Sequence, residues 1–212
     1  HEAGHSIHTS YSNENQPYTT ANYTIFVAEV ASTFNEQLLL DHLLKTSNDK
    51  DLKIVVLQNA IDGLIGTFYR QTLFADYEYQ AHELGVKGLP ITHESLSNIM
   101  VELYMQYYGI DLNTEPMKKY VWCYIPHLFH TPFYVYQYAT SFASSLAIYS
   151  KVKNKEENAF ENYLKLLKAG GSTYPVDIIK GAGVDLTNKE SFMAVVDRIS
   201  DLVNQLEKLL EE

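Results

Sequence analysis

The feature that most constrains this chain stands at its start, where the first five residues read His1-Glu2-Ala3-Gly4-His5. Residues four apart lie on one face of an α-helix, so a helix here would place the imidazoles of His1 and His5 side by side. Two imidazoles at this spacing can hold one zinc ion, and Glu2 can take a proton from a zinc-bound water. The pattern therefore predicts a metal site on a helix. The alternative from spacing alone is a surface helix without a metal.

A third ligand is expected from a second helix, because catalytic zinc sites usually have three protein ligands and one exchangeable water. Glu29 lies within the apolar stretch 27–31, where an unpaired carboxylate would be costly to desolvate. Glu36 lies seven residues later, on nearly the same helical face. We prefer Glu29 as the ligand and assign Glu36 a supporting role behind the ligands. His8 continues the face of the two histidines, but three ligands along one straight helix cannot converge, so we expect packing or support there.

Composition favours an all-α fold. The 212 residues are 46% hydrophobic, include only ten glycines and six prolines, and contain long stretches with the period of a helix. We expect helices over about 25–45 and 47–84, from Thr92 to Gly109, and in the amphipathic segment after Asn188. We treat residues 1–212 as one region.

Charge and cysteine content exclude several classes of protein. The chain has 16 Lys and Arg residues against 26 Asp and Glu, a formal charge of −10, which argues against a nucleic-acid surface. No run of 18 apolar residues occurs, so no membrane span is predicted. The single cysteine, Cys123, excludes an intrachain disulfide and is typical of a reducing compartment, so we expect a cytoplasmic protein. The sequence predicts no particular oligomeric state.

A second informative stretch surrounds Pro132. Proline is tolerated in the first turn of a helix, which predicts a helix over about 132–151. On that helix Tyr134 and Tyr138 would share one face, and with His127 from the preceding loop they could donate hydrogen bonds to an oxyanion. An aromatic core stripe is the alternative interpretation of the two tyrosines.

The start of the chain also bears on its organisation. No methionine precedes His1, and the metal motif begins at its first ligand. We therefore expect these residues to be the C-terminal piece of a longer protein, whose other part supplies the start of the first helix and one wall of the site. We expect the piece to be inactive alone.

Five stretches in a fixed order resemble a known family. They are His1–His8, Phe26–Ser32, Arg70–Ala75, His127 with Phe133–Thr140, and Gly170–Ser172 with Pro175. Together they resemble the catalytic C-terminal region of oligoendopeptidase F, within the thimet oligopeptidase family of zinc metallopeptidases. The resemblance covers nearly the whole chain.

The resemblance implies a multi-helix, zincin-like catalytic lobe of a larger helical peptidase, with a channel that admits short peptides and excludes folded proteins. It implies zinc held by His1, His5 and Glu29, with Glu2 as general base. It also implies that three further side chains bind substrate and stabilise the tetrahedral intermediate, namely His127, Tyr134 and Tyr138.

Two hypotheses follow. The first is a zinc metalloendopeptidase that hydrolyses short peptides by attack of a zinc-bound water, with a glutamate as general base. The second is a non-catalytic helical module that binds peptides through a surface rich in tyrosine, of which the chain has 17. Cleavage that a chelator abolishes reversibly would separate the two.

Overall fold

The chain folds into two compact helical units. The computed structural model describes residues 1–112 and 114–211, and every regular element in them is helical, which confirms the all-α prediction. Unit 1 comprises residues 1–68 with the chain from Thr140 onward, and unit 2 comprises Tyr69–Ala139. No helix in the described ranges is long and apolar enough to span a membrane. That both units belong to one catalytic region stays a prediction.

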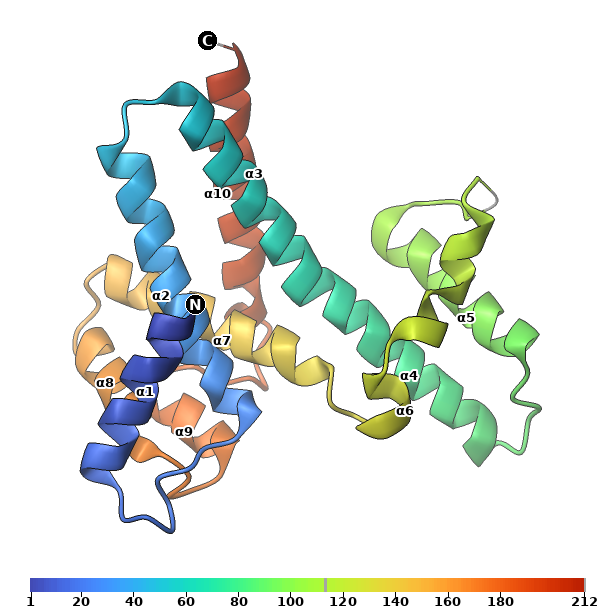
Figure 1. The fold of residues 1–212 in the computed structure, drawn as a ribbon, viewed down its shortest axis with the longest axis horizontal. Coiled ribbons are helices and arrows are strands. Elements are labelled where there is room, and N and C mark those ends of the chain that lie inside the picture. Colours follow the sequence, from blue (N-terminus) through green and yellow to red (C-terminus); the bar gives the residue numbers. More distant parts are fainter. Residues whose placement is uncertain (113, 212) are drawn as a thin grey trace. The chain divides into compact units, whose positions relative to one another are not determined.

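Unit 1 is built from helices at both ends of the chain (Figure 1). They are α1 (Glu2–Asn15), α2 (Ile25–Thr46), α3 (Lys50–Leu64), most of α7 (Tyr136–Lys153), α8 (Ala159–Ala169), α9 (Pro175–Gly181) and α10 (Glu190–Glu211). Helix α1, dark blue in Figure 1, packs against α2 and α8, and the red α10 packs against α3. The two helices that carry the predicted zinc ligands are therefore neighbours.

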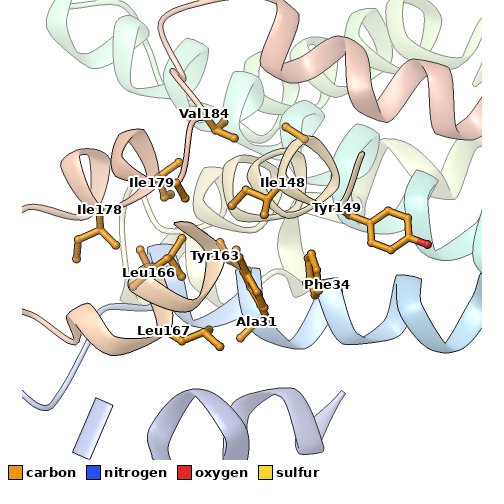
Figure 2. Packing of buried hydrophobic residues seen from close by; sticks show 14 of the residues in the cluster. Ala31, Phe34, Ile148, Tyr149, Tyr163, Leu166, Leu167, Ile178, Ile179 and Val184 are labelled. Carbon is orange, nitrogen blue, oxygen red and sulfur yellow. The ribbon is translucent and has the colours of Figure 1, made fainter. Parts of the chain in front are cut away.

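The main core of unit 1 lies where α2, α7, α8 and α9 meet. Figure 2 shows side chains from these helices converging on one another. Phe34 of α2 stacks on Tyr163 of α8 with ring centroids 4.0 Å apart, and Ile148 and Ile179 are almost fully buried beside them. Each buried side chain of this size contributes about 1.5–3 kcal/mol. The cluster thus holds α2 in position within the unit.

A cluster of polar side chains around Asp41 joins α2 to α7 and α10. Asp41 accepts hydrogen bonds of 2.6 Å from Tyr149 and from Arg198, and it pairs with Lys153 at 2.6 Å. Burial raises the pKa of Asp41, but these three donors outweigh burial and hold the pKa below its usual value. The buried Arg198 also donates to Gln37 at 3.0 Å. Its charge is therefore paired, as burial of a charge requires.

Unit 2 is built from the middle of the chain. Its elements are α4 (Arg70–Val86), α5 (His93–Tyr108), the 3-10 helix η2 (Pro116–Tyr124) and the short α6 (His127–His130). Helix α5 starts where predicted, because Thr92 and Ser95 form a capping box, and it ends at Gly109, whose φ of 65° favours glycine. The hydrophobic core of unit 2 is made of Leu73, Phe74, Tyr77, Ile99, Met100, Leu103, Val121 and Val135.

The single helix predicted over 47–84 is interrupted. Helix α3 ends at Leu64, a π-helical turn η1 (Ile65–Tyr69) follows, and α4 begins at Arg70. Apolar residues continue through the turn, so periodicity did not reveal it.

The helix predicted from Pro132 begins instead at Tyr136. Phe133 has a φ of 57°, a left-handed conformation that an α-helix cannot contain. Its N–H donates a hydrogen bond of 2.7 Å to Glu78 Oε1 on α4. The predicted start was wrong because this hydrogen bond, between residues 55 positions apart, stabilises a turn in place of a first helical turn.

Candidate functional site

His1 and His5 lie side by side at the start of α1. His1 precedes the helix, and its carbonyl accepts hydrogen bonds from the N–H groups of Gly4 and His5. The two rings meet edge to face with centroids 4.8 Å apart, and their Nε2 atoms are 3.2 Å apart. The spacing of four residues therefore brings the two imidazoles together, as predicted.

Gly4 sets the approach of α1 to α2. A Cβ atom added at Gly4 would lie 2.5 Å from Ser32 Cα and 2.7 Å from the Ala31 carbonyl oxygen, so only glycine fits. The two helices therefore touch backbone to backbone at this point. This close approach places the histidines of α1 beside Glu29 of α2.

Substituting Gly4 with alanine tests this contact. The added methyl group would push α1 away from α2, and we expect the free energy of unfolding to fall by about 1–3 kcal/mol. Chemical denaturation measures the change. Gly63→Ala is the matched control, because a Cβ atom there meets nothing within 4 Å and a helical alanine is favoured over glycine. A Gly4→Ala protein as stable as the parent would contradict the close approach.

Glu29 faces both histidines. Its Oε2 lies 3.4 Å from Nε2 of His1 and 3.7 Å from Nε2 of His5, and its side chain is 17% exposed. The buried Ser32 donates a hydrogen bond of 3.0 Å to the same oxygen, and Thr33 donates to the Glu29 carbonyl at 2.6 Å. The carboxylate is therefore held towards the imidazoles.

These three groups have the donor set and the spacing for a zinc ion. Ligand atoms bound tetrahedrally at 2.0–2.1 Å lie roughly 3.3–3.4 Å from one another, and the separations here are 3.2, 3.4 and 3.7 Å. Two imidazoles and one carboxylate also match the ligands of catalytic zinc sites, which leave a position for water. Within the described residues, His1, His5 and Glu29 are the group that could hold a metal ion.

Glu36 contacts the other nitrogen of His1. Nδ1 of His1 donates to Glu36 Oε1 at 2.8 Å, and burial raises the pKa of Glu36 above its usual value. A carboxylate on Nδ1 holds the proton there and leaves the lone pair on Nε2, as in many metal sites. Between the two candidate carboxylates, the geometry therefore favours Glu29 as ligand and Glu36 as its support.

Glu2 and His8 lie on α1 in different surroundings. Glu2 is exposed in the first turn. His8 is fully buried and stacks on Tyr23 with ring centroids 3.7 Å apart. Burial lowers the pKa of His8 to about 4, so the ring is neutral. It acts as a packing residue, one of the two roles expected for it.

His127, Tyr134 and Tyr138 cluster in unit 2. The His127 ring stacks on Tyr134 at 5.3 Å and meets Tyr138 edge-on at 6.2 Å, and the two tyrosine rings are 5.6 Å apart. Tyr134 precedes α7, so the two tyrosines do not share a helical face. Their rings still meet because the chain already turns between them, where the Gln137 N–H donates a hydrogen bond of 3.1 Å to the Tyr134 carbonyl.

Three residues that contact or position the predicted site residues of either unit were not predicted from the sequence. Gly4 allows α1 to approach α2, and Ser32 donates a hydrogen bond to Glu29. The buried Glu78 accepts the hydrogen bond that stabilises the turn before Tyr134. Of the three, only Gly4 could have been suspected from the sequence, because a glycine within a helix often marks close packing against a neighbour. Ser32 and Glu78 stand in ordinary helical patterns.

The sequence matches a known family of peptidases. The family model described as Peptidase family M3 matches residues 1–197. The chain is 41% identical over 211 residues to an oligoendopeptidase F homolog of Borreliella burgdorferi, covering 100% of this chain and 36% of that protein. It is 41% identical over 212 residues to the chromosomal oligoendopeptidase F of Lactococcus lactis subsp. cremoris, covering 100% and 35%.

A solved structure has the same fold. The crystal structure of oligoendopeptidase-F from Enterococcus faecium matches with a TM-score of 0.87 and 40% identity, over 99% of this chain and 38% of that one. The chain therefore spans about a third of the length of the curated relatives that it matches.

Proposed function

The chain belongs to peptidase family M3, and we propose that it forms the C-terminal catalytic region of a zinc endopeptidase that hydrolyses short peptides. The observation that carries the proposal is the convergence of His1, His5 and Glu29, whose ligand atoms lie 3.2–3.7 Å apart. A surface helix with two histidines would not explain the carboxylate held against both rings.

His1, His5 and Glu29 would hold the zinc ion, which when bound supplies a water of lowered pKa and polarises the scissile carbonyl. Glu36 fixes the proton of His1 on Nδ1, so Nε2 keeps its lone pair for the ligand role. Ser32 restrains the Glu29 oxygen that faces the imidazoles. These contacts organise the ligands before any substrate arrives.

Glu2 acts as the general base. It takes a proton from the attacking water and later returns it to the leaving amine, so that hydrolysis yields a carboxylic acid and an amine. Its exposure in the first turn of α1 supports this role, because water and substrate can reach it.

His127, Tyr134 and Tyr138 bind the peptide. Imidazole and phenol groups donate hydrogen bonds, which can hold backbone carbonyls and stabilise an oxyanion as it develops. The clustering of the three rings supports this assignment, as does the resemblance of His127 and Phe133–Thr140 to the family.

Activity belongs to a longer protein that contains this chain. The relatives are about three times as long, and their remaining part would complete the channel. We refer to that longer protein as the full-length protein. The single Cys123 supports a cytoplasmic location.

Metal removal tests the proposed function. We expect the full-length protein to cleave an internally quenched peptide, to lose this activity with a chelator, and to regain it with stoichiometric zinc. Fluorescence release measures cleavage. The 212-residue chain alone is the comparison, and we expect it to be inactive. Cleavage at full rate after verified metal removal would contradict zinc hydrolysis, and binding without cleavage would support the peptide-binding module instead.

A further inference from the structure

Unit 2 contains a cavity of about 550 Å³ that His127 and Tyr138 help to line. This volume is within the usual range for sites that take small ligands or peptide segments. The residues around it come from α4, α5, η2, α6, the first turn of α7 and the short connection before α6. The cavity is therefore lined in part by side chains that we propose bind the peptide substrate.

The charge of this cavity is opposite to that of the chain. Arg70 and Lys118 line it, and none of the described lining residues is Asp or Glu. The chain as a whole carries a formal charge of −10. A cationic cavity on an acidic protein favours an anionic ligand over a cationic one.

Arg70 is the cation most available to a ligand. It is exposed and hydrogen-bonds the Tyr108 hydroxyl, and no carboxylate in the described part of the chain forms an ion pair with it. A guanidinium can bind both oxygens of a carboxylate at once. Lys118 is already paired with Glu115 at 2.8 Å, so its contribution should be smaller.

Other walls of the cavity are apolar or neutral. Phe74 and Val121 are buried beneath it, and Ile125 is partly buried beside them. Tyr104 also lines it, and burial raises the pKa of Tyr104, which keeps the hydroxyl protonated as a hydrogen-bond donor. The surroundings thus suit a carboxylate attached to an apolar group.

We propose that this cavity binds a carboxylate of the peptide substrate, with Arg70 as its main partner and Lys118 as a second. The carboxylate is either the C-terminal one or that of an Asp or Glu side chain. The inference rests on the peptidase function proposed above and names what that site recognises in its substrate.

Peptides that differ only in a carboxylate test this inference in the full-length protein. The first peptide has a free C-terminus and no acidic residue, the second is its C-terminal amide, and the third is the amide with one Asp. We expect Arg70→Gln to raise KM for one carboxylate-bearing peptide about tenfold, with little change in kcat, and to leave KM for the amide unchanged. The peptide that responds identifies the source of the carboxylate.

Lys118→Gln and Lys119→Gln form a matched pair on η2. Both remove one positive charge, but Lys119 does not line the cavity and lies over the Tyr120 ring. We expect Lys118→Gln to raise the same KM less than Arg70→Gln does, and Lys119→Gln to leave it unchanged. Circular dichroism establishes that each variant is folded. If neither Arg70→Gln nor Lys118→Gln changes the ratio of KM values between acid and amide peptides, the inference is overturned.

Binding measured without hydrolysis separates this inference from the proposed function. Fluorescence anisotropy of labelled peptides in the presence of a chelator reports the dissociation constant alone. Weaker binding of the carboxylate peptide by Arg70→Gln supports the cavity even if the protein never cleaves a peptide. Cleavage by a protein whose Arg70→Gln variant binds acid and amide peptides as the parent does supports the peptidase and overturns the carboxylate site.

Discussion

Replacing Glu2 with glutamine should lower kcat of the full-length protein by about 10²- to 10⁴-fold while leaving its zinc content unchanged. Glutamine has the size of glutamate but cannot accept the proton of the attacking water. KM should change little, because the side chain is not assigned to substrate binding. Steady-state kinetics with a quenched peptide and elemental analysis of the same sample measure both quantities.

Glu14→Gln is the matched control for this experiment. It removes the same charge from the same helix, and Glu14 is exposed near the other end of α1, where it accepts a hydrogen bond from Ser10. Its activity should equal that of the parent. A Glu2→Gln protein with nearly normal kcat would show that another group is the base. Loss of zinc from that protein would instead make Glu2 a ligand.

Replacing Glu29 with alanine should remove the metal. The substitution leaves two imidazoles, and two protein ligands are fewer than catalytic zinc sites usually have. We expect zinc content to fall from one ion per chain to near zero after dialysis, and peptide cleavage to fall with it. Elemental analysis and competition with a chromogenic chelator measure the loss.

Glu36→Gln distinguishes the ligand from its support. Glu36 contacts only Nδ1 of His1 in the candidate site, so its loss should weaken zinc affinity by about 10–100-fold. The effect of Glu29→Ala should be larger than this. Stoichiometric zinc in Glu29→Ala together with metal loss in Glu36→Gln would transfer the third-ligand role to Glu36. Thermal unfolding followed by circular dichroism checks that both proteins remain folded.

Helix positions were largely determined by local sequence. Asp49 caps α3 by accepting a hydrogen bond from the Leu52 N–H, and Thr92 and Gly109 bound α5 as predicted. Such signals act within one or two turns, so a single sequence carries them. The spacing of His1 and His5 is information of the same kind, because the geometry of one helix brings the rings together.

Turns stabilised by distant residues could not be predicted. Phe133 is held in a left-handed conformation by a hydrogen bond to the carboxylate of Glu78, 55 residues earlier, and this turn precludes a helix that begins at Pro132. No local pattern records such a partner. The π-helical turn after Leu64 could not be predicted either, because its apolar residues continue the pattern of the flanking helices.

The sequence by itself determined the helical class, most helix ends and the pair of imidazoles on one face, because these depend on neighbours along the chain. Only the tertiary structure decided which carboxylate faces both imidazoles and which supports His1. Glu29 and Glu36 are nearly equivalent in a helical pattern, and they differ because backbone contact at Gly4 sets α1 against one part of α2. Packing between segments distant in sequence made that choice.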